Sequence, residues 1–174
     1  MSLTETWREE IKEKGNTLYW DSKIASIAHQ KTAQRWNDIA ISLGLLITMF
    51  SAFAGATLFA ESETFALIAG ILALIVSVAS AVNTFLKPGE GKVNHETAHK
   101  SYLELCNDAE YFWNTESSKI FDSVEKAQEI LGELYKSLIN RKSDLQVNSP
   151  MIPVWAERIA QEEVYILAHM RELD

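Results

Sequence analysis

The sequence contains little cysteine and little proline. Cys106 is the only cysteine among 174 residues, so no disulfide can form within one chain. Three prolines and seven glycines leave long uninterrupted stretches, and no segment has the alternating pattern or turn signals of β-strands. We therefore predict an all-α protein whose single thiol suits a reducing compartment.

Charge is missing from two long apolar runs. Residues 39–60 and 64–86 contain no Asp, Glu, Lys, Arg or His. Each run exceeds the roughly 20 residues that a helix needs to cross a bilayer. Only Glu61, Ser62 and Glu63 separate the runs, and the remaining polar chain is too short to cover two buried core helices. The sequence therefore predicts a transmembrane hairpin of two antiparallel helices in contact with lipid.

The charged residues indicate how this hairpin is oriented. Basic residues flank both runs, whereas the turn holds two acids and no base. Trp36, Arg35 and Lys87 stand where interfacial anchors belong. The positive-inside rule therefore predicts that both termini are cytoplasmic. The net charge of −8 argues against nucleic-acid partners, and no apolar segment typical of a signal peptide occurs near Met1.

The segment before the hairpin has two helical patterns. Residues 4–14 have the spacing of a short amphipathic helix, and Gly15-Asn16 is a typical helix end. A second helix is expected to begin near Thr17 and to continue into the first apolar run, because no proline interrupts it. The predicted organisation has cytoplasmic N-terminal helices at 1–38, the hairpin at 39–86 with spans 39–60 and 64–86, and a cytoplasmic helical bundle at 87–174.

Two loops divide the segment after the hairpin. Residues 87–91, with sequence KPGEG, predict a linker after which a helix resumes at Val93. Asp122 and Glu125 are spaced as a capping box that would start a further helix. Pro153 is suited to the first turn of a last helix. The whole segment is therefore expected to be helical.

Small residues four apart occur in both spans. In the first span these are Ser51 and Gly55, and in the second they are Ala66 and Gly70, with Ala73 on a second stripe that begins at Ala69. Such residues let helices approach closely in a membrane. The spacing predicts helix association but does not distinguish contacts within the hairpin from contacts between subunits.

Polar residues without charge gather near the cytoplasmic end of the second span. They are Ser77, Ser80, Asn83 and Thr84, and the first span adds Ser42 and Thr48. Two interpretations are open: hydrogen bonds between helices, or a water-lined path through an oligomer. Since neither span contains a charged residue, an ion pump or proton relay is not expected.

The stretch His95-Glu96-Thr97-Ala98-His99 matches H-E-x-x-H, the helical zinc motif of metalloproteases. Tyr102 and Leu105 stand where the extended motif needs Gly and His, so a third ligand is missing. We interpret the match as a coincidence on an amphipathic helix and expect no metal, no cofactor and no enzymatic activity. A zinc metalloprotease is the remote alternative.

Over residues 17–113 the arrangement resembles the SLATT family, the SMODS- and SLOG-associating two-transmembrane effector domains of bacterial conflict systems. A long helix leads into a tight hairpin, and Pro-Gly is followed by a helix that contains His95, Ala98, Tyr102 and Leu105. The resemblance implies a homo-oligomeric, pore- or channel-forming effector of the bacterial inner membrane that acts in antiphage defence. It also implies a trigger from a nucleotide-second-messenger synthase or sensor encoded nearby, and it transfers no catalytic residues. From the residues alone, a membrane-anchored helical scaffold that recruits a cytoplasmic partner is the alternative.

Overall fold

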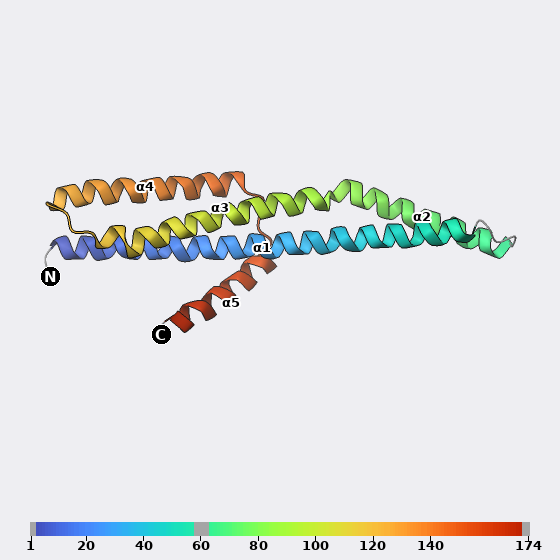
Figure 1. Ribbon diagram of the computed structural model, residues 1–174, viewed down its shortest axis with the longest axis horizontal. Coiled ribbons are helices and arrows are strands. Elements are labelled where there is room, and N and C mark those ends of the chain that lie inside the picture. Colours follow the sequence, from blue (N-terminus) through green and yellow to red (C-terminus); the bar gives the residue numbers. More distant parts are fainter. Residues whose placement is uncertain (1–2, 58–62, 172–174) are drawn as a thin grey trace. The chain divides into compact units, whose positions relative to one another are not determined.

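The secondary structure is helical throughout the described part of the chain (Figure 1). The computed structural model describes residues 3–57 and 63–171. Helices account for 92% of these residues and no strand occurs among them, which confirms the predicted all-α fold. The elements are α1 (Leu3–Thr57), α2 (Glu63–Leu86), α3 (Pro88–Asn114), the short 3-10 helix η1 (Glu116–Ser118), α4 (Val124–Asn148) and α5 (Val154–Arg171).

The chain divides into two compact units. Unit 1 comprises Met1–Thr32 and Asn94–Asp174, and unit 2 comprises Ala33–Val93. Unit 2 contains the end of α1, all of α2 and the start of α3, and therefore includes most of the two apolar runs. The predicted end of the first span at Ala60 and the turn residues Glu61 and Ser62 lie outside the described residues.

Helix α1 continues through Gly15 and Asn16. The predicted helix end at this position is therefore wrong, and one helix replaces the two that were expected before the first span. A Cβ atom added to Gly15 would lie 2.8 Å from Cδ1 of Phe112 and 3.4 Å from Cβ of Trp113. No described glycine has a positive φ. Gly15 thus allows α1 and α3 to pack closely and does not provide the left-handed residue that ends many helices.

Between α2 and α3 the helix is interrupted at Lys87 only. The predicted linker over residues 87–91 and the predicted helix start at Val93 are therefore wrong. Pro88 is the first residue of α3, where its missing N–H is not needed. Its ring disfavours a helical conformation at the preceding residue, and Lys87 has a φ of 44°. The two helices thus meet at a single left-handed residue.

Helix α4 begins one residue later than the expected capping box implies. Ser123, not Asp122, is the N-cap, and its side chain accepts a hydrogen bond from the backbone N–H of Lys126 at 3.2 Å. Asp122 instead forms an ion pair with the ammonium of Lys126 at 3.1 Å. Ser123 has the extended backbone of an N-cap residue, from which its side chain reaches the third N–H of the helix.

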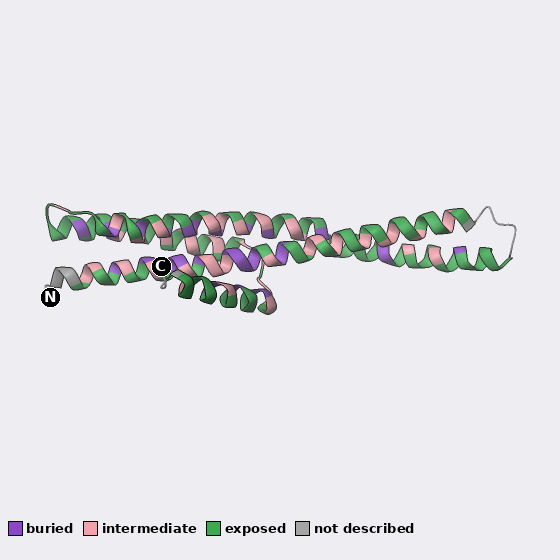
Figure 2. Ribbon diagram, turned by 60° about the horizontal axis from the view of Figure 1, so that its bottom comes forward, coloured by how far each residue is buried: buried purple, intermediate pink, exposed green. Residues whose placement is uncertain are grey.

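Unit 1 is held together by three apolar clusters that join α1 to the helices after the hairpin (Figure 2). The apolar spacing of α3 predicts one buried face with Ala98, Tyr102, Leu105, Ala109 and Trp113; the first four are buried, and Trp113 is half-buried. Two clusters join α1, α3 and α4, and the third joins α1 to α5. Their buried members are Ile11, Phe112 and Leu131; Leu18, Tyr19, Cys106 and Ala109; and Ile27, Ala28, Ala156, Ala160 and Val164.

The Cys106 thiol is expected to be unreactive in the folded protein. Its side chain is 1% exposed. Burial raises the pKa of the thiol to about 11, although Lys23 acts in the opposite direction. Reaction with a disulfide reagent at pH 8 should be slower by about a hundredfold than for a Ser143→Cys variant, because Ser143 is exposed on α4. Fast labelling of wild-type protein in the absence of denaturant would contradict this expectation.

Candidate functional site

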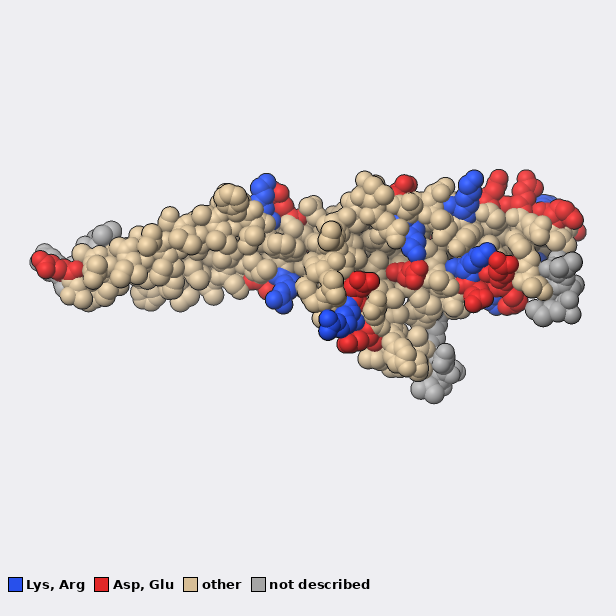
Figure 3. Space-filling view, turned by 180° about the vertical axis from the view of Figure 1, so that it is seen from behind, with Lys and Arg blue, Asp and Glu red and all other residues tan. Residues whose placement is uncertain are grey.

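Unit 2 exposes large apolar side chains on both of its long helices. Ile41 is 60% exposed, and Leu67 and Leu74 are each 67% exposed. One stretch in α1 and one that begins at Glu63 are long and apolar enough to cross a membrane. In the most apolar 18 residues of each stretch, the share of buried residues is 0% for the first stretch and 11% for the second. Figure 3 shows a long surface with almost no charged side chains. The alternative of two buried core helices is therefore not supported.

Helices α1 and α2 contact each other through one narrow stripe each. On α2, Ala69 and Ala79 are buried, and Val76 and Ser80 are half-buried. On α1 the half-buried residues recur at every third or fourth position, as in Leu43, Ile47, Phe50 and Ala54. Residues at this spacing lie on one face of a helix. The opposite face of each helix is consequently open.

The small residues that predict helix packing lie mostly outside this stripe. Ser51, Ala66, Gly70 and Ala73 are exposed, and Gly55 is half-buried. No described atom lies within 4 Å of a Cβ atom built on Gly55 or Gly70. The hairpin therefore does not use either glycine for a close approach of its own two helices.

The polar residues of α2 lie beside the α1 contact. Ser77, Asn83 and Thr84 are exposed, whereas Ser80 is half-buried. The hydroxyl of Thr84 donates to the backbone carbonyl of Ser80 at 2.9 Å, so its hydrogen is used within the helix. The structure thus brings Ser77, Ser80 and Thr84 to one side of α2.

The polar residues of α1 do not lie on the stripe through which α1 contacts α2. Ser42 and Thr48 are both exposed, and neither belongs to the half-buried set that includes Leu43 and Ile47. The hydroxyl of Thr48 donates to the backbone carbonyl of Gly44 at 2.8 Å. Hydrogen bonds between the two helices of the hairpin therefore do not explain why either polar residue occurs in this apolar helix.

The predicted interfacial anchors lie at the end of the hairpin where α2 meets α3. Gly91 of α3 lies against the indole of Trp36, since an added Cβ would be 2.9 Å from Cδ2 of the ring. Lys87 forms an ion pair with Glu90 at 2.9 Å, and Arg35 is exposed on α1. An indole and two cations at one end of two apolar helices are the groups that favour a bilayer interface.

The H-E-x-x-H pattern lies in unit 1, where its first histidine contacts α1. Nδ1 of His95 is 2.9 Å from Nδ1 of His29. The two imidazoles are 1% and 5% exposed for His29 and His95. The ring of His29 also stacks on Tyr102, with 5.4 Å between centroids. One ring of the histidine pair must carry hydrogen on Nδ1 and the other must accept it.

The second histidine of the pattern has a different partner. Nδ1 of His99 is 2.9 Å from both the backbone carbonyl oxygen and the hydroxyl oxygen of Ser26. The Ser26 hydroxyl donates to the backbone carbonyl of His99 at 3.2 Å. Glu96 is half-buried. Within the described residues no three His, Cys, Asp or Glu side chains converge as metal ligands would. The two histidines therefore link α3 to α1.

Burial sets the charge state of the histidine pair. It lowers the pKa of His29 to about 4, and the neighbouring His95 and His99 act in the same direction. Burial also lowers the pKa of His95. Both rings are therefore neutral at pH 7, and the contact is a hydrogen bond between uncharged groups.

Sequence reasoning missed the α1 side of this contact. Ser22, Ser26, His29 and Thr32 are all buried, with exposed fractions of 1% to 3%. They recur at steps of four, three and three. That spacing is a helical face, but polar side chains on a face normally indicate solvent. The helical spacing of these residues was visible in the sequence, but their polar side chains predicted a solvent-exposed face and not a buried one.

The fold and these sites define an all-α protein with two helices able to cross a membrane. Comparison of the chain with known protein families, with curated proteins and with solved structures finds no match.

Proposed function

We propose that the protein is a homo-oligomeric effector of the bacterial inner membrane that forms a pore or channel in antiphage defence. The proposal takes up the resemblance to the SLATT family and places both termini and unit 1 in the cytoplasm. In this proposal the protein is not an enzyme and uses no cofactor. Its trigger is a nucleotide-second-messenger synthase or sensor encoded nearby.

One observation supports the oligomer most directly: α2 carries an exposed face of small residues that its own hairpin leaves uncovered. Alternating steps of four and three keep such residues on one side of a helix, as in coiled coils. All members of the face are exposed except Ser80, which is half-buried. The face comprises Ala66, Gly70, Ala73, Ser77, Ser80 and Thr84.

The two ends of this face have different chemistry. Gly70 and the neighbouring alanines offer only backbone and methyl groups, which favours close packing against a second α2. Ser77 and Thr84 add hydroxyl groups nearer to Lys87. In an oligomer built on this face, the apolar half would seal subunits together and the hydroxyl half would meet water. Of the two interpretations of the polar residues, this proposal therefore adopts the water-lined path.

The test measures assembly and ion passage in the same preparations. Wild-type protein reconstituted in liposomes is expected to release trapped ions, and cross-linking should give one ladder of oligomers. Gly70→Leu should abolish the oligomer, because a leucine side chain prevents the close approach of two helices. Ser77→Leu should retain the oligomer and lower ion release, since it replaces a hydroxyl on the wetted half by an apolar group.

Val78→Leu is the matched control, because Val78 is adjacent in sequence and 57% exposed but lies off the small-residue face. It should leave both assembly and ion release unchanged. Liposomes that retain their ions at high density of wild-type protein would reject the pore. Equal losses in Val78→Leu and Ser77→Leu would reject this face as the relevant surface.

A membrane-anchored scaffold is the second candidate function, and exposed apolar residues on α5 support it. Ala156 and Ala160 on one face of α5 are completely buried, whereas Tyr165 and Ile166 beyond them are 64% and 57% exposed. An exposed apolar helix face suits a partner helix. Under this alternative, Ile166→Asp would abolish capture of the partner, and wild-type liposomes would not release ions.

A further inference from the structure

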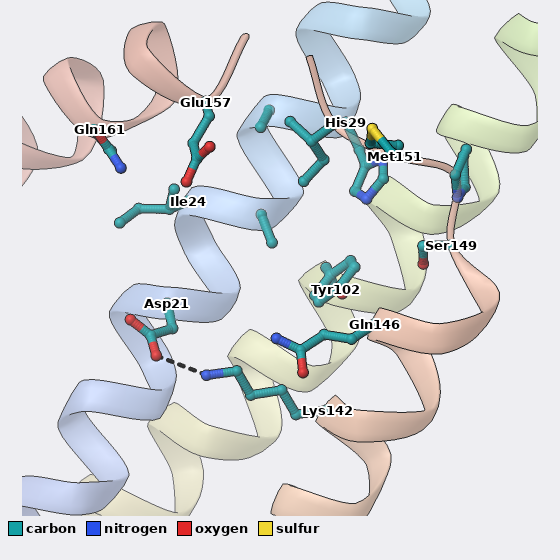
Figure 4. A pocket seen from close by; sticks show the side chains of 14 residues that line it. Asp21, Ile24, His29, Tyr102, Lys142, Gln146, Ser149, Met151, Glu157 and Gln161 are labelled. Atoms are coloured by element: carbon teal, nitrogen blue, oxygen red, sulfur yellow. Dashed lines mark hydrogen bonds and ion pairs between the residues drawn. The ribbon is translucent and has the colours of Figure 1, made fainter. Parts of the chain in front are cut away.

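A pocket in unit 1 lies outside the hairpin, beside His29 of the histidine pair (Figure 4). Its walls come from α1, α3, the end of α4, the following loop and the start of α5. The pocket has a volume of about 400 Å³, within the range of small-molecule sites. His29 and Tyr102, both almost completely buried, form one side.

The pocket combines an apolar wall with hydrogen-bonding groups. Ile24, Ala25 and Ile152, all half-buried, supply the aliphatic surface. Figure 4 shows the side chains of Gln146 and Glu157 extending toward the space from opposite helices, α4 and α5. An aliphatic surface beside a few polar heads is typical of a site that binds a small molecule with one polar end.

The charges around the pocket determine whether it favours a ligand with a positive or a negative polar group. Lys142 is its only lining cation among the described residues, and its ammonium is paired with Asp21 at 2.7 Å. Glu157 has no ion pair with any described residue. Two carboxylates against one ammonium leave the lining with a net charge of −1. A phosphate or carboxylate ligand would be repelled, whereas an ammonium or guanidinium group would be attracted.

We propose that this pocket binds an organic cation: an ammonium or guanidinium group on a short alkyl chain. The cationic group would lie at the Glu157 carboxylate. The alkyl chain would pack on Ile24 and Ala25. The same group occurs in free amines and in the basic side chain of a protein partner, and the pocket recognises the chemistry common to both. This proposal does not depend on pore formation, because it concerns binding by unit 1.

The test uses the full chain in detergent at low salt, with binding measured by calorimetry. The probes are agmatine, a blocked arginine (N-acetyl-arginine amide) and AMP as an anion. Agmatine and blocked arginine are expected to bind, and AMP is not. Glu157→Gln should weaken binding of both cations by about fivefold, the upper range for an exposed ion pair. Gln161→Glu, which adds a carboxylate to the lining, should strengthen binding by a similar factor.

Glu162→Gln is the matched control, since Glu162 is exposed on the same helix but does not line the pocket. It should change neither affinity. Tighter binding of agmatine would indicate a free amine as the ligand, and tighter binding of blocked arginine would indicate a partner's side chain. The proposal is overturned if neither cation binds to wild type or to Gln161→Glu, if AMP binds more tightly than both, or if Glu157→Gln and Glu162→Gln have equal effects.

Discussion

Lowering the pH from 7 to 5 is expected to destabilise the protein by about 2 kcal/mol through His29 alone. Burial and its histidine neighbours lower the pKa of His29 to about 4 in the folded state. In the unfolded chain the pKa of histidine is about 6.5. Between these values the unfolded state binds more protons, so stability is complete above pH 6.5 and is lost as the pH falls toward 4. The lowered pKa of His95 contributes in the same direction.

Thermal unfolding followed by circular dichroism in detergent tests this expectation. The midpoint should fall by about 4–8 °C between pH 7 and pH 5 for a chain of this size. His29→Gln should flatten the dependence, because the amide can still donate to Nδ1 of His95 but does not titrate. His169→Gln should leave the pH dependence of the midpoint unchanged, because His169 is exposed on α5. A wild-type midpoint that is constant over this interval, or an equal slope in His29→Gln, would refute the assignment.

Replacing Gly15 by alanine should lower the free energy of unfolding by up to about 2 kcal/mol, although alanine is the better helix former. The new methyl group would lie 2.8 Å from Cδ1 of Phe112 and 3.1 Å from Cε1. The Phe112 ring cannot move away freely, because it is 2% exposed and packs with Ile11 and Leu131. Overpacking of a core costs about 1–3 kcal/mol, which exceeds the helical gain of about 1 kcal/mol.

Gly132→Ala is the matched control in a second helix of unit 1. No described atom lies within 4 Å of a Cβ atom at Gly132, so the substitution should stabilise by up to about 1 kcal/mol. In a double-mutant cycle, Phe112→Leu should relieve part of the cost of Gly15→Ala, because it removes the ring atoms that meet the methyl group. Stabilisation by Gly15→Ala would show that α1 and α3 do not approach closely at this point.

Helical periodicity in the sequence was a sound guide to the buried face of α3 but not to that of α5, where Ala156, Ala160 and Val164 are buried and the more apolar Ile159 and Ile166 are exposed. The spacing of Ala98, Tyr102, Leu105 and Ala109 correctly indicates the buried side of α3. The rule for helix ends failed at Gly15, because a glycine can serve either a left-handed turn or a close contact. Only the position of Phe112 on another helix distinguishes these uses. The same limitation applies to residues 87–91, where Pro88 begins a helix and only Lys87 interrupts one.

Some of the candidate sites were recognisable in the sequence and others were not. The small and polar residues of α2 were recognisable because they differ from the large apolar residues around them. The contact between His29 and His95 was not, since the two residues lie 66 positions apart and the match to a zinc motif pointed to His99 instead. The pocket was equally hidden, because its lining comes from four helices and a loop.

By itself the sequence determined the helical fold class and the two stretches able to cross a membrane. Both follow from local properties: side-chain period, run length and the absence of charge. Tertiary structure alone decided which glycines are crowded, which histidines meet, which face of α2 is open and where the pocket lies. Each of these depends on which helices become neighbours, and a long-range contact leaves no mark in the spacing of either segment.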